Sequence, residues 1–293
     1  MKYASAALLG LFLASAFTPA NASKGIPGNA DHRFAQLETL LPTAGTTRTA
    51  SGAPGAQYWQ QRADYRIKVT LDEKRHRLIA SQSITYMNRS PDTLSYIWLQ
   101  LDQNIFKDDS IARRSEVAAN SGTRRDSVGK GDSLSFAAMR RHQAFQDRKY
   151  GYDIGQVRDA SGRVLRTTVN DTMMRIDLHQ PLRPGTSIEI RFDWESNIVN
   201  EAAIGARGGY EYFEGSDTYQ YFLAQWFPRL VAYTDYTGWQ HKQFLGRGEF
   251  TLEFGDYDVE LTVPADHIVA STGELQNADA VLTATQRERL KRA

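Results

Sequence analysis

The sequence predicts a mostly β protein whose antiparallel sheets pack as a sandwich or a saddle-like domain. Short segments in which apolar and polar residues alternate recur from Tyr65 onward, which is typical of half-buried strands. Clusters of Asn, Asp, Gly and Pro separate these segments at hairpin spacing. The strands are also too numerous for a single open sheet to stay flat, so packed sheets are expected.

The length and the composition limit the classes of function. The 293 residues are 41% hydrophobic and 24% charged, with a net charge of +1, so the chain can bury a core and does not have a disordered composition. Both signs of charge are spread along the chain, which argues against a nucleic-acid partner. Cysteine is absent, which excludes a thiolate nucleophile, cysteine metal ligands and disulfides.

The first 22 residues are predicted to be a secretory signal peptide. Lys2 supplies the positive charge, residues 4–17 form an apolar run too short to span a bilayer stably, and residues 20–22 give the small-x-small cleavage pattern. The alternative is an uncleaved N-terminal anchor. We therefore expect a periplasmic or secreted protein with no membrane span after cleavage.

The elements that follow are expected in this order. Residues 23–56, rich in Gly, Pro, Ala, Ser and Thr, form a linker with a short helix at 32–41. The first three strands follow at hairpin spacing and predict one antiparallel sheet. Residues 107–149 break the pattern as a charged loop insertion with a short helix at 136–145. The strands are expected at residues 65–71, 78–87, 93–101, 152–158, 164–169, 173–178, 187–194, 210–213, 219–227, 247–254 and 257–263.

The search for chemistry gives no recognisable catalytic set. No two of the six histidines are four residues apart, so a zinc site on one helix is excluded, although a site assembled across strands stays open. The sequence has neither a G-x-S-x-G nucleophile elbow nor a phosphate-binding P-loop. Dispersed carboxylates and histidines leave an unrecognised enzyme as one hypothesis. We therefore assign no catalytic or metal-binding residue to this chain.

Aromatic residues crowd the span from Tyr210 to Trp239. One interpretation is core packing with cross-strand pairs, because aromatic side chains suit a half-buried pleated surface. The other is a ligand-facing ledge, where aromatic area combines with a few polar groups. On a continuous strand, Gln220 and Gln225 lie on opposite faces, so at most one of them belongs to a given ledge.

Residues 58–275 resemble the N-terminal domain of bacterial exported zinc aminopeptidases in the aminopeptidase N and leukotriene-hydrolase (gluzincin) family. The most specific matches are AQWFPR at 224–229, FLGRGEF at 244–250 and FGDYDVELTVPADHIVASTGEL at 254–275. The resemblance implies a saddle-like β-domain, with bounds at 57–275, that packs over a zinc-bearing catalytic domain acting on peptides. It also implies that a Gln or Glu of the β-domain helps to hold the free α-amino group of the substrate, and Gln225 is best placed for this.

The rest of the family's pattern is absent from these 293 residues. The H-E-x-x-H motif, the downstream glutamate ligand and the transition-state tyrosine are missing, so the zinc belongs to a catalytic domain outside this chain, which we expect to be inactive alone. Residues 276–293 are expected to begin a truncated helical segment, with a capping box at Thr285-x-x-Glu288. The alternative is a free-standing β-sandwich module that binds a peptide, a glycan or a protein partner.

Overall fold

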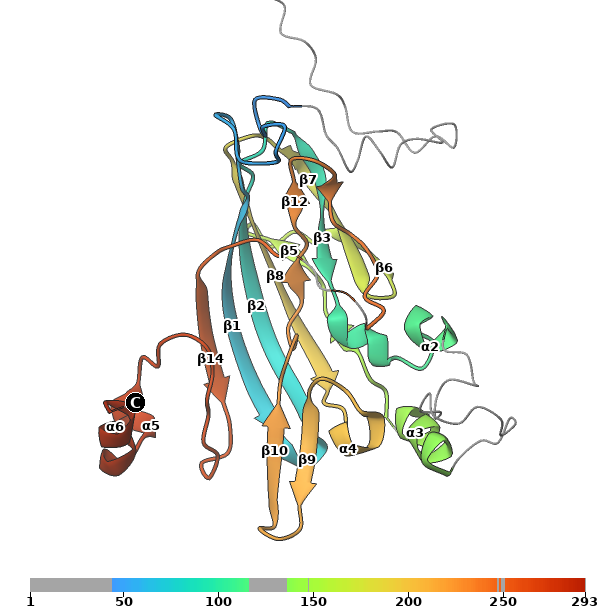
Figure 1. Ribbon diagram of the computed structural model, residues 1–293, viewed down its shortest axis with the longest axis vertical. Helices are drawn as coiled ribbons and strands as arrows, with labels where there is room; N and C mark the ends of the chain where they lie inside the picture. The colour runs from blue at the N-terminus through green and yellow to red at the C-terminus, as the bar shows by residue number, and fades with distance from the viewer. Residues whose placement is uncertain (1–43, 116–135, 147, 247, 249–250, 293) are drawn as a thin grey trace, which may run out of the picture.

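A computed structural model describes residues 44–292, apart from residues 116–135, 147, 247 and 249–250. Two sheets of unequal size pack face to face, and the core lies between them (Figure 1). The mostly β architecture with several antiparallel sheets, predicted from the alternating pattern, is confirmed.

The larger sheet has the strand order β14-β1-β2-β8-β4, with β5 also paired to β8. Its pairs are antiparallel except that β14 runs parallel to β1. The alternation in β1 turns one row of side chains into the core and leaves the charged row outside. The strands are β1 (Arg62–Asp72), β2 (Arg77–Met87), β4 (Tyr152–Ile154), β5 (Arg158–Asp159), β8 (Ser187–Asn197) and β14 (Tyr257–Thr262).

The smaller sheet has the order β11-β3-β7-β6, and all its pairs are antiparallel. Its strands are β3 (Leu94–Gln100), β6 (Arg166–Asn170), β7 (Met173–Leu182) and β11 (Arg229–Leu230). The prediction that the first three strands share one sheet is therefore wrong for the third. The chain crosses between the sheets after β2, where buried Asn88 donates to the backbone carbonyls of Asp92 and Leu182 at 2.7 and 3.1 Å.

The core is formed by the facing rows of the two sheets. Ile67 and Ile84 of the larger sheet and Ile97 and Ile176 of the smaller one are at most 1% exposed. Trp194 of β8 is also 1% exposed, and its indole nitrogen donates to the Gln82 side chain at 3.0 Å. Burial of apolar area at these positions supplies the main free energy of folding in a chain with no disulfide.

Two hairpins and several short helices complete the described residues. The hairpins are β9 (Gly209–Phe213) with β10 (Thr218–Phe222), which projects from the lower end of the molecule in Figure 1, and β12 (Tyr233–Thr234) with β13 (Gly238–Trp239). None of the helices in the described residues has the length and hydrophobicity needed to cross a bilayer. They are η1 (Glu73–Arg75), η2 (Asp102–Phe106), α2 (Ile111–Ser115), α3 (Phe136–Gln146), α4 (Glu201–Ile204), α5 (Ala278–Val281) and α6 (Ala284–Leu290).

Several predicted elements differ in detail. The strand expected at 219–227 ends at Phe222, and the one expected at 152–158 is divided between β4 and β5. The described part of the strand expected at 247–254 makes only isolated bridges, at Leu252 and Phe254. The signal peptide at 1–22 and the helix at 32–41 lie outside the described residues.

The last helix begins two residues before its predicted start. Thr283, and not Thr285, is the capping residue, because its hydroxyl accepts from the backbone nitrogen of Gln286 while the Gln286 side chain accepts from the backbone nitrogen of Thr283. Glutamine serves at the third helical position as well as glutamate does, so two overlapping capping boxes were available in the sequence. The helix adopts the one that starts earlier.

Glu253 carries a partly buried carboxyl group. It lies between the two isolated bridges at Leu252 and Phe254, and its carboxylate accepts from the backbone nitrogen of Tyr233 at 2.7 Å. Burial raises the pKa of Glu253 from 4.5 to about 7, against the lowering effect of that hydrogen bond. The folded protein therefore favours the neutral carboxyl at mildly acidic pH.

This burial predicts a pH dependence of stability. Because the folded-state pKa lies above the unfolded-state value, the stabilisation from Glu253 is complete below about pH 4.5 and is lost as the pH rises through about 7. Relative to Glu253→Gln, the free energy of unfolding should fall by roughly 3 kcal/mol over that range, measured by urea denaturation at several pH values. The exposed control Glu214→Gln should leave the profile of the unaltered chain unchanged. Parallel profiles for Glu253→Gln and the unaltered chain would contradict this assignment.

Candidate functional site

The candidate site lies in the segment 223–228, which connects β10 to β11. Here the chain leaves the β9–β10 hairpin and returns to the smaller sheet. Gln225, the substrate-contacting residue predicted from the sequence, is partly exposed and has a left-handed backbone with φ of 52°. Such a conformation is unusual for a residue other than glycine and costs about 1–3 kcal/mol unless its surroundings impose it.

Two side chains hold the backbone at Gln225. The Gln103 amide nitrogen donates to the carbonyl oxygens of Ala224 and Gln225, at 3.2 and 3.0 Å. The Tyr152 hydroxyl donates to the Gln225 carbonyl as well, at 3.2 Å. Gln103 belongs to η2 and Tyr152 to β4, so two separate elements fix the same peptide groups. These hydrogen bonds offset the strain at Gln225.

The far end of the segment is fixed by a buried ion pair. The Arg229 guanidinium donates to one Asp102 carboxylate oxygen at 2.5 and 3.0 Å, and the Gln100 side chain donates to the other oxygen. The side chain of Asp102 is 1% exposed and that of Arg229 is 14% exposed. Burial raises the pKa of Asp102, while Arg229 acts in the opposite direction. The carboxylate therefore depends on its guanidinium partner in this position.

Two further polar contacts fix the return to the smaller sheet. The Gln82 amide of β2 donates to the Pro228 carbonyl at 2.8 Å, and the Tyr65 hydroxyl of β1 accepts from the Leu230 nitrogen at 2.8 Å. Gln82 is itself oriented by Trp194, as described above. The backbone from Ala224 to Leu230 is thus held by side chains from β1, β2, β4 and η2, outside any regular ladder until β11 begins.

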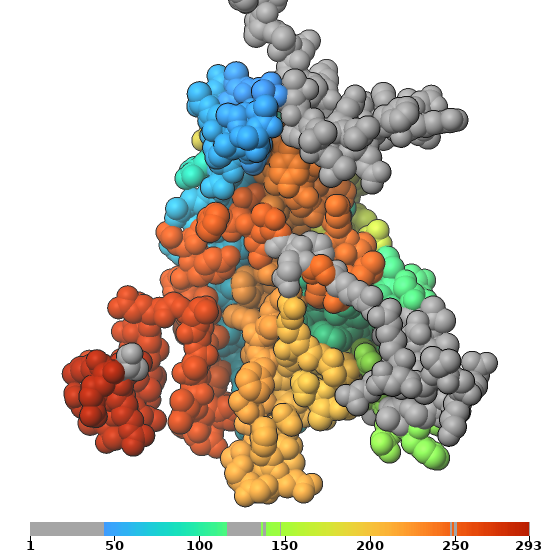
Figure 2. Space-filling view, viewed as in Figure 1, coloured from blue at the N-terminus to red at the C-terminus, as the bar shows by residue number. Residues whose placement is uncertain are grey.

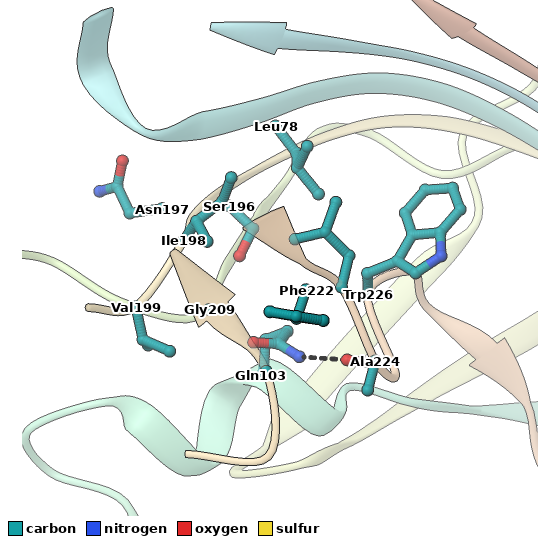
Figure 3. A pocket seen from close by; sticks show the side chains of 12 residues that line it. Leu78, Gln103, Ser196, Asn197, Ile198, Val199, Gly209, Phe222, Ala224 and Trp226 are labelled. Carbon is teal, nitrogen blue, oxygen red and sulfur yellow. Dashed lines mark hydrogen bonds between the residues drawn. The ribbon is translucent and has the colours of Figure 1, made fainter. Parts of the chain in front are cut away.

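A small cavity adjoins this segment (Figure 3). Its volume is about 20 Å³, which is room for about one water molecule. Figure 3 shows Gln103, Ser196 and Phe222 around it, with the Gln103 amide bonded to the Ala224 carbonyl. This cavity is too small for a peptide or a sugar.

The aromatic band divides into a packed part and an exposed part. Trp226 and Phe227 pack against the core, with ring centroids 4.9 Å apart. The β9–β10 hairpin carries four tyrosines on one face, paired in register across the two strands, and two of them, Tyr212 and Tyr219, are 45% and 40% exposed. Gln220 and Gln225 do not belong to one continuous strand, because the strand ends at Phe222. The prediction that Gln220 and Gln225 lie on opposite faces assumed one continuous strand, so it does not apply.

Two of the six histidines are brought together beside the hairpin. His76 donates to or accepts from the Tyr221 hydroxyl at 2.8 Å and stacks on Tyr210 at 3.8 Å, while the His267 ring lies 5.9 Å from that of Tyr221. Burial lowers the pKa of His76, and Arg148 lowers it further. Among the described residues, no group of three or more His, Asp or Glu side chains is arranged to hold a metal ion.

The residues that build the site were not all found from the sequence. The family resemblance selects Gln225, whose role stays a prediction, whereas Gln103, Asp102 and Tyr152, which hold the segment around it, were not selected. The signal for two of them was the LQLDQN segment at 99–104, which closes β3 with polar residues immediately after an apolar strand. A buried polar run at a strand end indicates side chains that satisfy a neighbouring backbone.

Comparisons with known proteins show only a low structural similarity to part of some solved proteins. No protein-family model matches the sequence, and a search of curated proteins gives no match. Among solved structures, a mutant M1 zinc metallopeptidase from Deinococcus radiodurans bound to a Tyr-Ser-Ala substrate has 13% identity and a TM-score of 0.34, over 74% of this chain and 37% of that chain. A mutant two-domain M1 zinc metallopeptidase bound to L-tryptophan has the same identity and TM-score, over 80% and 40%.

The chain spans about two fifths of the length of these metallopeptidases. At this identity the likeness concerns fold alone, and it is a likeness to part of an M1 zinc metallopeptidase.

The ion pair at the end of the segment predicts a strong and non-additive effect on stability. Asp102→Leu leaves the Arg229 guanidinium buried without its partner, so the free energy of unfolding should fall by about 3–5 kcal/mol. Arg229→Leu should have a similar effect. The double variant should lose less than the sum of the two, because no unpaired charge remains. Urea denaturation of the three variants tests this, and additive losses would contradict it.

Proposed function

We propose that this chain is the N-terminal β-domain of an exported zinc aminopeptidase that removes residues from the amino ends of peptides. In this proposal the zinc and the residues that activate water belong to a catalytic domain outside the 293 residues, and the β-domain contributes to substrate binding. The observation that carries the proposal is the clamped, left-handed backbone at Gln225, the same residue that the family resemblance selects. Strained backbone held in place by its surroundings is characteristic of binding and catalytic sites.

The Gln225 side chain has the chemistry that this role needs. Within the described residues its amide makes no hydrogen bond, whereas its backbone carbonyl is occupied by Gln103 and Tyr152. A side-chain carbonyl oxygen accepts a hydrogen bond from an ammonium group, and bonds to charged donors are worth about 1.5–3 kcal/mol. A free α-amino group is such a donor, while an acetylated amino terminus is not. The site therefore favours peptides with a free amino end.

One face of β14 supports the presence of a partner domain. Register pairs Tyr257, Val259 and Leu261 with Tyr65, Ile67 and Val69 of β1, so both rows point to the core side of the sheet. The β1 residues are at most 5% exposed, but their β14 partners are 38–48% exposed. Figure 2 shows β14 and the β9–β10 hairpin as separate ridges on this surface. An apolar row of this kind is suited to burial against a neighbouring domain.

A second candidate function is favoured by the hairpin. Tyr212, Phe213, Tyr219 and Phe222 are each 40–53% exposed on a two-stranded ribbon that projects from the sheet. Exposed aromatic side chains of this density suit a free-standing module that binds a peptide, a glycan or a protein partner. Such a module would bind without any zinc domain, which separates the two proposals by experiment.

The coding DNA gives the first test of the aminopeptidase proposal. Beyond the codon for Ala293, we expect an in-frame H-E-x-x-H motif within about one domain's length. In the resulting zinc-loaded enzyme, Gln225→Ala should lower kcat/KM for a peptide with a free amino end by about 10- to 100-fold, because one charged hydrogen bond is lost. Gln220→Ala on β10 is the matched control and should leave kcat/KM unchanged. A reading frame without the motif would overturn the proposal.

The exposed row on β14 predicts self-association of the chain when it is produced alone. An uncovered apolar row on an edge strand promotes contacts between copies. We expect light scattering at tens of micromolar to show species larger than a monomer, and the double variant Val259→Lys with Leu261→Lys to reduce them. The control Asp258→Lys with Glu260→Lys changes the polar face of the same strand and should not. A monodisperse monomer for the unaltered chain would count against a domain-covering role for β14.

A further inference from the structure

We infer that Gln103 is the positioning residue of this site, and that its amide sets the direction in which Gln225 presents its side chain. The inference rests on the proposed function, because it concerns how the amine-binding group is held. Among the described residues, the hydrogen bonds of the Gln103 amide nitrogen go to two backbone carbonyls, those of Ala224 and Gln225. Its role is therefore to orient Gln225 and not to contact the substrate.

The two hydrogen bonds of Gln103 are incompatible with an extended chain at Gln225. In a strand, successive carbonyl groups point to opposite sides, so one donor group cannot reach two of them in a row. Successive carbonyls point to the same side only in a helical conformation, right- or left-handed. A single amide nitrogen within 3.2 Å of both oxygens thus selects a helical geometry at this residue, and the backbone adopts the left-handed form with φ of 52°.

The element that carries Gln103 is itself fixed. The residue before Gln103 in η2 is Asp102, which is held by Arg229. The residue after it is Asn104, whose side chain donates to the Asp171 carbonyl at 2.7 Å and accepts from the Tyr152 backbone nitrogen at 2.9 Å. These contacts lie on both sides of Gln103 in a five-residue helix. The donor is therefore presented by a rigid support, as the precise placement of a binding group requires.

The consequence is a change in side-chain direction at Gln225. Continuing β10 beyond Phe222 would keep side chains alternating across the two faces of the hairpin. The left-handed residue interrupts this alternation before Trp226, whose ring packs against the core beside Trp194 at 6.1 Å between ring centroids. Gln225 is left partly exposed on the surface between the hairpin and the sheets. Loss of the Gln103 donor should allow the backbone to relax and the amide to turn away.

The test uses the isotopically labelled 293-residue chain and nuclear magnetic resonance titration. The probes are alanyl-alanine, which has a free amino end, and its N-acetylated form, which does not. The unaltered chain should bind only the free form, with a shift of the Gln225 side-chain amide signal. Gln103→Met, which keeps the size but removes the donor, should weaken this binding about tenfold and change the φ-dependent coupling between the amide and α protons of Gln225.

Two further variants keep the result interpretable. Gln276→Met is the matched control, since the exposed Gln276 amide also donates to a backbone carbonyl, that of Glu274 at 3.0 Å, and it should bind as the unaltered chain does. Tyr152→Phe removes only one donor to the Gln225 carbonyl and should weaken binding about threefold. It provides the measurement if Gln103→Met fails to fold.

The outcomes separate the inference from the function on which it rests. If the unaltered chain does not distinguish the free from the acetylated dipeptide, both the amine-binding role and this inference are overturned. The other case is that the unaltered chain binds only the free dipeptide and that Gln225→Ala abolishes this discrimination. If Gln103→Met and Tyr152→Phe then keep full affinity and an unchanged coupling, the inference alone is overturned. Weakened binding with the coupling changed supports the positioning role, whereas a loss of stability without either effect contradicts it.

Discussion

The structure depends on the way in which one irregular segment is held between its two sheets. From Ala224 to Pro228 the backbone forms no ladder, yet it lies between the hairpin and the core, where unpaired peptide groups would each cost about 1–3 kcal/mol. Side-chain donors from separate elements meet this requirement: Gln82 from β2, Gln103 from η2 and Tyr152 from β4. Because these donors come from strands and a helix that are fixed by the core, the position of the segment follows from the packing of the whole domain.

The same arrangement explains the distribution of rigidity around the site. The large sheet is held by long antiparallel ladders and an apolar core, whereas the β9–β10 hairpin pairs with no third strand among the described residues. A two-stranded ribbon alone is marginally stable in water. Contacts of His76 with Tyr210 and Tyr221 tie its base to the turn between β1 and β2, which compensates in part. Gln225 lies three residues beyond the end of this ribbon, and hydrogen bonds from Gln103 and Tyr152 hold its carbonyl.

Sequence patterns predicted most of the regular elements but not the side chains that hold the segment around Gln225, and both results have physical reasons. The alternation of apolar and polar residues in β1, β2 and β8 follows from burial of one face of each strand. This pattern lies within each short segment, so the sequence predicts it directly. Where the chain crosses to the second sheet before β3, Asn88 donates to the carbonyl of Leu182, 94 positions away, and no local sequence pattern indicates such a contact. Gln103 and Tyr152 donate hydrogen bonds to a residue more than 70 positions away, so the spacing of residues along the chain does not predict their role. Gln225 was predicted as a site residue through resemblance to a family, whereas alternation predicted it to lie on a strand that ends at Phe222 instead.

The residues of the AQWFPR segment at 224–229 differ in the contacts that they make. The Ala224 carbonyl accepts from Gln103, the rings of Trp226 and Phe227 pack on the core, the Pro228 carbonyl accepts from Gln82, and Arg229 pairs with buried Asp102. Each of these residues therefore makes a structural contact, through its side chain or its backbone carbonyl. The Gln225 side chain is different, because its backbone is held firmly while its amide has no partner in the described part of the chain. A polar group placed with such support and left unpaired at the surface is what a binding site requires. In the proposed function, the Gln225 amide is the group of this segment that is free to bind a ligand, and the contacts of its neighbours fix the backbone on both sides of it.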